Sequence, residues 1–227
     1  AEARIKAELV FAKTIQTSAM PTVFPERDDY EIHAFMRTAK EVGGDFYDFY
    51  MTSGDTLHFL IADVSGKGIP AAMFMMRAKA VLRSFTEQGY NVDDAFIEAN
   101  NELCTGNDAG MFVTAWQGNM DLNTGEVSFA NAGHNLPVIK HKDGKFEYHK
   151  QKINMVLAGI EDTHYDPNTV TLLPGDIIFL YTDGVTEATD ADNNMFGEER
   201  LLDVLNSKDF TSTEEICNEM IKAIDEF

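Results

Sequence analysis

Two aspartates flank a short stretch of the chain that has the pattern of a β-hairpin. Asp45 follows Gly43-Gly44, and Asp63 precedes Val64-Ser65-Gly66-Lys67-Gly68. The apolar residues between the aspartates alternate and are interrupted at Ser53-Gly54-Asp55, which is typical of two antiparallel strands joined by a turn. Such a hairpin would place Asp45, at the start of its first strand, beside Asp63, at the end of its second. Two ordinary turn aspartates are an equal alternative at this level, because Asp and Gly are common turn residues.

Carboxylates placed side by side could hold a metal ion. They repel each other unless a cation lies between them, and neither aspartate has a basic residue next to it, so a hard divalent cation is the natural counter-charge. The run Phe179-Leu180-Tyr181-Thr182-Asp183 is another hydrophobic strand that ends in Asp, and carboxylates at strand ends can meet at one sheet edge. Oxygen ligands without His or Cys suit Mg²⁺ or Mn²⁺ rather than Zn²⁺. Two such ions about 3.5–4 Å apart can acidify a bridging water for in-line attack on a phosphoryl group.

Other catalytic arrangements fit the sequence less well. Cys104 is followed six residues later by Gly110 instead of Arg, so the phosphate-binding loop of a cysteine phosphatase is missing. The sequence also lacks a G-x-S-x-G elbow and a P-loop. His134, within Asn131-Ala132-Gly133-His134-Asn135, could act as an acid, but a structural turn histidine is the favoured interpretation. Lys67 could contact a substrate phosphate, although a solvated lysine is the safer interpretation.

Length, composition and charge limit the class of protein. With 227 residues and a 44% hydrophobic share, the chain suits one domain of generous size, or one domain with an appended helix. Its apolar runs stay below the roughly 18 residues that span a bilayer, and no signal-peptide pattern opens it. Two cysteines are too few for a disulfide framework, which indicates a reducing cytoplasm. A formal net charge of −20 disfavours nucleic acid and anionic lipid as partners.

The first 20 residues are predicted to form a helix that ends before Pro21. One face carries a 4-3-4-3 spacing that could be a coiled-coil seam, made of Ile5, Leu9, Ala12, Gln16 and Ala19. Phe11 and Ile15 lie on another face and could dock on the domain. The helix is therefore either a dimerising or signalling helix, or a plain packed one.

The rest of the chain predicts hairpins flanked by pairs of helices. A strand is expected at residues 31–36, before the hairpin, and a buried strand at 177–181 that runs into Thr182-Asp183-Gly184 after a turn at Pro174-Gly175-Asp176. Other strands are expected at 111–121, 126–130, 136–141 and 146–148, with an irregular crossing at 150–170. Helices are expected at 70–88, 92–103, 198–206 and 213–227. Because strands and helices do not alternate as in βαβ units, the pattern indicates an α+β layered sandwich.

Five ordered motifs resemble the SpoIIE/RsbU branch of the PPM (protein phosphatase 2C) superfamily of metal-dependent serine/threonine phosphatases. They are Gly43–Asp48, Asp63–Gly68, Met111–Ala115, Asn131–His134 and Tyr181–Ala188. The resemblance runs from about residue 30 to the C-terminus, and residues 12–16 look like the linker that precedes this domain in its relatives. It implies an N-terminal linker helix at residues 1–24 and a phosphatase domain at 25–227. The implied fold is a four-layer αββα sandwich of two antiparallel sheets.

The resemblance also implies roles for individual residues. Asp45 and Asp63 look like ligands shared by two Mn²⁺ or Mg²⁺ ions, Val64 would offer its backbone carbonyl, and Asp183 would bind the second ion. Supporting or substrate-contacting roles are implied for Gly44, Gly66, Lys67 and Glu187. The implied reaction is hydrolysis of phosphoserine or phosphothreonine by a metal-activated water, without a covalent enzyme intermediate. The implied partners are a small STAS-domain anti-sigma-factor antagonist as substrate, an upstream sensory module, and a second copy bound through the N-terminal helix.

One departure from the family pattern leaves an alternative open. Relatives carry a final strand that opens with Asp-Asp, whereas this sequence stops at Asp225-Glu226-Phe227, so the second metal site would lack a carboxylate and a sheet would lack a strand. A scaffold that binds a phosphoprotein without hydrolysing it is therefore the alternative. Gly43-Gly44-Asp45-Phe46 is also superficially similar to the metal-binding hairpin of diguanylate cyclases, but this region supplies almost none of the cationic side chains that grip triphosphates.

Overall fold

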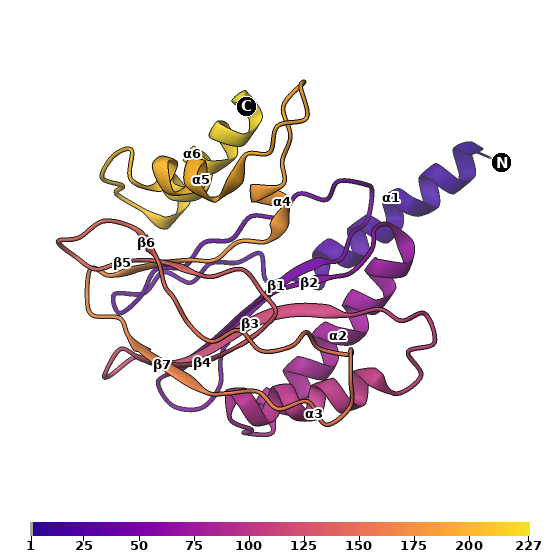
Figure 1. Cartoon of the computed structure of the whole chain (residues 1–227), viewed down its shortest axis with the longest axis horizontal. Coiled ribbons are helices and arrows are strands. Elements are labelled where there is room, and N and C mark those ends of the chain that lie inside the picture. The colour runs from indigo at the N-terminus through magenta and orange to yellow at the C-terminus, as the bar shows by residue number, and fades with distance from the viewer. Residues whose placement is uncertain (1) are drawn as a thin grey trace. The chain divides into compact units, whose positions relative to one another are not determined.

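The computed structural model describes residues 2–227, which form an α+β protein with two sheets (Figure 1). The chain divides into two compact units. The first contains the chain up to Thr22 together with Met36–His134 and Lys152–Val170, and the second contains Val23–Phe35, Asn135–Gln151 and Thr171–Phe227. The predicted α+β class and pair of antiparallel sheets are confirmed. The predicted boundary at residue 24 stays a prediction.

The first unit is built on a five-stranded sheet in the order β1-β2-β3-β4-β7. Its strands are β1 (Asp45–Met51), β2 (Thr56–Val64), β3 (Val113–Asp121), β4 (Glu126–Ala132) and β7 (Asn168–Thr171). Three helices complete the unit: α1 (Glu2–Ser18), α2 (Ile69–Glu87) and α3 (Val92–Cys104). Helices α2 and α3 pack on the sheet and on each other (Figure 1).

Alternation along the strands gives this sheet two different faces. Phe46 and Ala62, which pair across β1 and β2, belong to one buried apolar cluster with Met75 of α2 and Phe96 of α3. Because successive side chains of a strand point to opposite faces, Asp45 and Asp63 belong to the other face. The helix-covered face therefore supplies apolar packing, and the opposite face carries the two candidate ligands.

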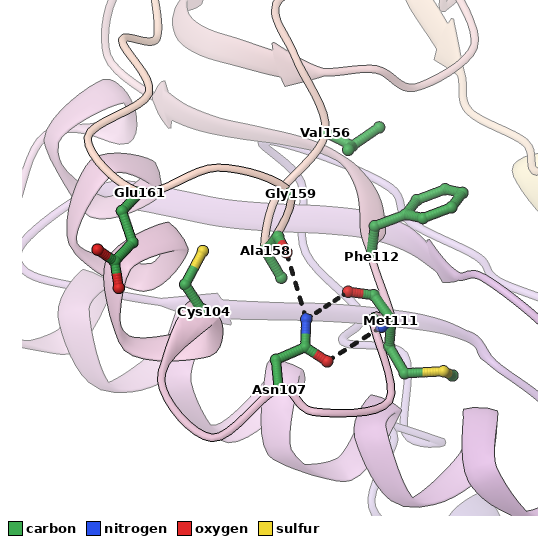
Figure 2. A pocket seen from close by; sticks show the side chains of 9 residues that line it. Cys104, Asn107, Met111, Phe112, Val156, Ala158, Gly159 and Glu161 are labelled. Atoms are coloured by element: carbon green, nitrogen blue, oxygen red, sulfur yellow. Dashed lines mark hydrogen bonds between the residues drawn. The ribbon is translucent and has the colours of Figure 1, made fainter.

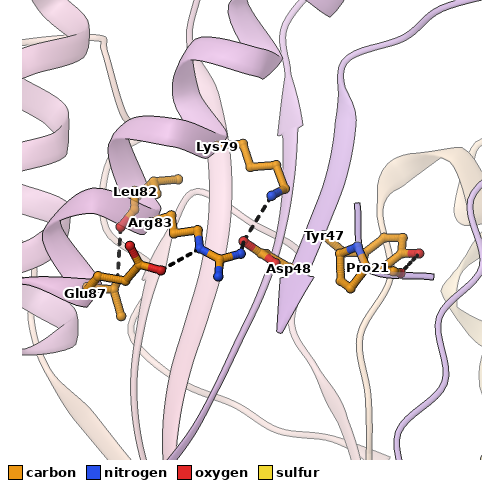
Figure 3. A network of polar contacts seen from close by, with 8 residues as sticks. Pro21, Tyr47, Asp48, Lys79, Leu82, Arg83 and Glu87 are labelled. Atoms are coloured by element: carbon orange, nitrogen blue, oxygen red, sulfur yellow. Dashed lines mark hydrogen bonds and ion pairs between the residues drawn. The ribbon is translucent and has the colours of Figure 1, made fainter. Parts of the chain in front are cut away.

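A buried ion pair connects α2 to the helix-covered face of β1 (Figure 3). Asp48, 2% exposed, accepts hydrogen bonds from Lys79 at 3.1 Å and from Arg83 at 3.4 Å, both on α2. Arg83 also pairs with Glu87 at 2.8 Å, and its guanidinium lies 4.1 Å from the centre of the Tyr50 ring. These contacts fix the position of α2 along β1.

The second unit contains a three-stranded sheet in the order β6-β5-β8. Its elements are β5 (Val138–Lys140), β6 (Glu147–Tyr148), β8 (Ile177–Phe179), α4 (Asp183–Thr186), α5 (Gly197–Leu205) and α6 (Thr213–Glu226). A separate apolar core joins them, with Phe146, Phe196, Leu201, Leu205, Ile216 and Met220 at its centre. The strand predicted as buried at 177–181 is shorter and only half-buried, because β8 lies at the end of this sheet in the part of the chain that the structure describes.

Two local predictions were wrong. Residues 31–36 form no strand, and Glu31 instead accepts hydrogen bonds from the backbone N–H and hydroxyl of Thr213 at 2.6 and 2.7 Å. Its carboxylate thus stabilises the N-terminus of α6, where the unpaired N–H groups favour an anion. The strand expected to end in Asp183 stops at Phe179, and Asp183 is instead the first residue of α4, since the N–H of Glu187 donates to the carbonyl of Asp183 at 2.8 Å.

Helix α1 packs with the opposite face from the one expected to dock. Gln16 is buried, while Phe11 and Ile15 are 67% and 50% exposed, so the predicted docking of these two side chains was wrong. Of the predicted coiled-coil seam, Leu9, Ala12 and Ala19 are half-buried and Gln16 is buried, whereas Ile5 is 57% exposed, and the side chain of Gln16 is hydrogen-bonded within the chain. The N-terminal part of α1 extends away from the sheet (Figure 1).

Among residues 2–227, no helix is both long enough and apolar enough to cross a membrane.

Candidate active site

Asp45 and Asp63 are register partners in the β1–β2 ladder. The N–H of Val64 donates to the carbonyl of Gly44 at 3.1 Å, so Gly44 and Val64 form a hydrogen-bonded pair. Hydrogen-bonded and non-hydrogen-bonded pairs alternate in an antiparallel ladder, which makes Asp45 and Asp63 a non-hydrogen-bonded pair with Cα atoms about 4.5 Å apart. Side chains approach each other most closely in such pairs. The hairpin predicted from the sequence, and the juxtaposition of its two aspartates, are confirmed.

Gly44 leaves room for the carbonyl of Val64. A Cβ atom at position 44 would lie 2.7 Å from the Val64 carbonyl oxygen and 3.3 Å from Cβ of Ala71 in the first turn of α2. Real Cβ contacts of 2.7 Å with a backbone oxygen do not occur without a backbone shift. Gly66 and Gly68 have φ values of 86° and 75°, the left-handed region that glycine tolerates, and Lys67 is exposed between them.

The row of side chains continues onto β3. Thr114 pairs with Asp63, and its hydroxyl donates to the backbone carbonyl of Asp63 at 3.4 Å and lies 3.2 Å from Nδ1 of His134. His134 is 2% exposed, and its N–H donates to the side chain of Asn131 at 2.7 Å. His134 is therefore a buried turn histidine, as the sequence favoured, that supports the end of β2 through Thr114.

Gln16 ties α1 to the start of β1. Its amide donates to the carbonyl of Gly43 at 2.6 Å and accepts from the N–H of Gly43 at 3.1 Å, and it also lies 3.3 Å from the sulfur of Met75 on α2. Both backbone groups of Gly43, two residues before Asp45, are thus satisfied by one side chain. In the sequence, Gln16 stands out as a polar residue at a position of the predicted seam that is normally apolar.

Asp183 lies in the second unit, as the first residue of α4. One of its carboxylate oxygens, Oδ1, accepts a hydrogen bond from the side-chain amide of Asn135 at 2.8 Å. The side chain of Glu187, one turn later, is exposed. Over residues 2–227, no group of three or more His, Cys, Asp or Glu side chains is placed to hold a metal ion. Joint ligation by Asp45, Asp63 and Asp183 therefore stays a prediction.

The donor set of the first unit fits a hard divalent ion. Two carboxylates face each other at Asp45 and Asp63, and Gly44 keeps space beside the neighbouring carbonyl of Val64. These are oxygen donors, which Mg²⁺ and Mn²⁺ prefer, and a divalent charge would offset the repulsion between the carboxylates.

A shallow cavity of about 380 Å³ adjoins this part of the first unit (Figure 2). It is lined by Cys104, Asn107, Gly110, Met111, Phe112, Val156, Ala158, Gly159 and Glu161. The amide of Asn107 bonds the N–H and carbonyl of Met111 at 3.0 and 2.7 Å and the carbonyl of Ala158 at 3.3 Å, as the dashed lines show. Two hydrogen bonds join Phe112 to Ser65. The N–H of Phe112 donates to the hydroxyl of Ser65 at 2.9 Å, and the N–H of Ser65 donates to the carbonyl of Phe112 at 2.8 Å. The cavity wall is thereby connected to the turn after Asp63.

Comparison with known proteins identifies the family. The family model described as Stage II sporulation protein E (SpoIIE) matches residues 53–227. The chain belongs to the SpoIIE family. Within it, the chain is 33% identical to phosphoserine phosphatase RsbU of Bacillus subtilis (strain 168) over 184 residues, which are 81% of this chain and 54% of RsbU. It spans 37% and 54% of the lengths of two curated relatives that it matches.

Solved structures show the same fold as this chain. The SiaA-PP2C domain of Pseudomonas aeruginosa superposes with a TM-score of 0.81 at 21% identity, covering 100% of this chain and 92% of that one. RsbX in complex with magnesium superposes with a TM-score of 0.60 at 18% identity, covering 82% of each chain. These matches confirm the protein phosphatase 2C fold that the sequence motifs implied.

Proposed function

We propose that this SpoIIE-family domain hydrolyses phosphoserine or phosphothreonine on a regulatory protein in a reaction that depends on Mn²⁺ or Mg²⁺. The register pairing of Asp45 with Asp63 is the observation that carries the proposal. It places two carboxylates side by side, an arrangement of oxygen donors that suits a hard divalent cation. The kinship with RsbU, named a phosphoserine phosphatase, supports the same reaction class.

Residues of the β1–β2 hairpin, of the turn after it and of α4 would bind the metal ions and the substrate phosphate. Asp45 and Asp63 would be ligands shared by two ions, Val64 would offer its backbone carbonyl, and Asp183 would bind the second ion. When bound, the ions supply an acidified water and neutralise charge on the phosphoryl group. Gly44 and Gly66 give the backbone the close approach and turn that this arrangement needs, and Lys67, exposed in that turn, would contact the substrate phosphate. Glu187 would support Asp183 from the end of α4.

The substrate and partners follow from the family and the charge of the chain. We propose a phosphorylated STAS-domain anti-sigma-factor antagonist as substrate, and a cytoplasmic setting in which an upstream sensory module acts through α1. Dimerisation through α1 would use its exposed face, with Phe11 and Ile15, because Gln16 is engaged with Gly43. With a net charge of −20, the domain offers no attraction to nucleic acid.

Turnover of p-nitrophenyl phosphate with Mn²⁺, and its abolition by a chelator, tests the reaction. Asp63→Asn is expected to remove the activity, whereas Asp55→Asn is expected to retain it. Asp55 is the matched control because it lies in the same hairpin, at its tip, where its carboxylate accepts from Asn123 at 3.1 Å. Equal activity of wild type and Asp63→Asn would refute the proposal, and binding of the phosphoprotein without turnover would favour a scaffold.

A further inference from the structure

The side chain of Asn135 contacts Asp183 because of the register of two strands. Residue 138 pairs with residue 179 in the β5–β8 ladder. Asn135 lies three residues before this pair on one strand and Asp183 lies four residues after it on the other, so antiparallel pairing brings both to the same end of the sheet. The 2.8 Å hydrogen bond between them therefore depends on the fold of the second unit.

This hydrogen bond fixes the direction of the Asp183 carboxylate. An ionised carboxylate only accepts hydrogen bonds, so the amide nitrogen of Asn135 must be the group that faces it. The bond engages Oδ1 and leaves Oδ2 for another partner. The backbone of Asp183 is held independently, since its carbonyl accepts from the N–H of Glu187 at 2.8 Å and from the hydroxyl of Thr186 at 3.5 Å.

We propose that Asn135 is a positioning residue for metal binding: it orients the carboxylate of Asp183 so that the second oxygen is presented to the ion. This inference rests on the proposed function, in which Asp183 is a metal ligand. Hydrogen bonds from outer residues to ligating carboxylates are a general device for setting their orientation, and removing such a bond typically weakens metal binding about 10–100-fold. Asn135 adjoins the Asn131–His134 motif, so one short segment supports Asp63 through His134 and Thr114, and Asp183 through Asn135.

Direct measurement of Mn²⁺ binding to the chain tests the role of Asn135 without relying on turnover. The free Mn²⁺ signal in electron paramagnetic resonance gives dissociation constants for wild type and Asn135→Ala. The matched control is Asn154→Ala, because the amide of Asn154 donates to the carboxylate of Asp166 at 2.7 Å at a site with no predicted ligand. We expect the dissociation constant of the weaker ion to rise about 10–100-fold in Asn135→Ala. In Asn154→Ala it should stay within about twofold of wild type.

A second readout separates positioning from a general structural role. If Asn135 orients a ligand, saturating Mn²⁺ restores the kcat of Asn135→Ala, and the Tm measured without metal stays close to that of wild type. A kcat that stays low at all Mn²⁺ concentrations, together with a lower metal-free Tm, would overturn the proposal. An Mn²⁺ affinity of Asn135→Ala equal to that of wild type would also overturn the proposal. If Asp183→Asn binds Mn²⁺ more weakly in the same experiment, the proposed function nevertheless stands. If Asp63→Asn and Asp183→Asn both bind Mn²⁺ like wild type, the proposed function itself fails.

Discussion

Asp45 and Asp63 face each other across β1 and β2, directly beside the hydrogen-bonded pair of Gly44 and Val64. Like charges directly opposite each other in an antiparallel pair destabilise a sheet. A divalent cation bound between the two carboxylates would offset this repulsion. The proposed function therefore has a thermodynamic test. The pair of Asp45 and Asp63 should lower the unfolding free energy of the metal-free domain and raise that of the metal-bound domain.

Asp63→Asn should therefore stabilise the metal-free domain while removing its response to metal. Relief of the repulsion with Asp45 is expected to raise the metal-free unfolding free energy by roughly 0.2–1 kcal/mol. Wild type should gain about 2.7 kcal/mol when Mn²⁺ is present at 100 times its dissociation constant, and the variant should gain almost none. Because loss of an outer hydrogen bond costs about 10–100-fold, loss of a direct ligand should lower activity by at least about 100-fold. Urea unfolding with Mn²⁺ or chelator measures both stabilities, and equal Mn²⁺ stabilisation of the two proteins would contradict the prediction.

Gly44→Ala should damage the site through its backbone. The added Cβ would lie 2.7 Å from the carbonyl oxygen of Val64, so the two strands must separate locally at a cost of about 1–3 kcal/mol. The Mn²⁺ affinity should fall as well, because the separation displaces the carbonyl of Val64, which is a predicted ligand. Gly54→Ala is the control: its φ is +58° but its Cβ meets nothing within 4 Å, so only a backbone cost of about 1 kcal/mol is expected. Calorimetric Mn²⁺ titration should separate the two variants, and equal Mn²⁺ affinities would count against a ligand role for Val64.

The hairpin could be predicted from the sequence because its signals are local. Alternating apolar residues and the Ser53-Gly54-Asp55 turn determine the register, and register alone places Asp45 opposite Asp63. The contacts of Gln16 with Gly43 and of Asn135 with Asp183 join residues 27 and 48 positions apart, and they depend on packing that no local pattern encodes. Residues 31–36 show the same limit, since their strand-like composition is overridden by the bond from Glu31 to Thr213, 182 positions away.

Lys79→Met alone should destabilise the first unit more than the double substitution that removes both Asp48 and Lys79. The single substitution leaves the 2%-exposed carboxylate of Asp48 with only Arg83, which is 3.4 Å away and itself 41% exposed, and should cost about 3 kcal/mol. Asp48→Leu combined with Lys79→Met removes the buried charge as well as its partner. It also removes Oδ1 of Asp48, which is buried without a hydrogen-bond partner. The double variant should then lie within about 1 kcal/mol of wild type in urea unfolding, and a loss as large as that of the single variant would contradict this account.

Gln16→Ala should destabilise the link between α1 and β1. It would leave the N–H and carbonyl of the half-buried Gly43 without their side-chain partner, at about 1 kcal/mol. Gln88→Ala is the control, because that amide donates to the carbonyl of Ser84 in an exposed position and should cost under about 0.5 kcal/mol. Hydrogen exchange at the amide of Gly43 measures the local effect, which should be faster in Gln16→Ala alone. Unchanged protection would show that this contact contributes little.

The buried side chain of His58 should make stability fall in mildly acidic solution. His58 is 1% exposed on β2, and burial lowers its pKa from 6.5 to about 4, against the opposing effect of its 2.7 Å hydrogen bond with Asn119. Between pH 6.5 and 4 the unfolded chain binds a proton that the folded domain does not, so the unfolding free energy decreases as pH falls through this window. At about 1.4 kcal/mol per pH unit, the loss attributable to His58 is roughly 3 kcal/mol by pH 4. His58→Gln removes this titration, so the difference in unfolding free energy between wild type and variant should shrink by that amount from pH 7 to pH 4. Since the other titrating groups are common to both proteins, parallel pH profiles in urea unfolding would show that His58 is protonated equally in the folded and unfolded states.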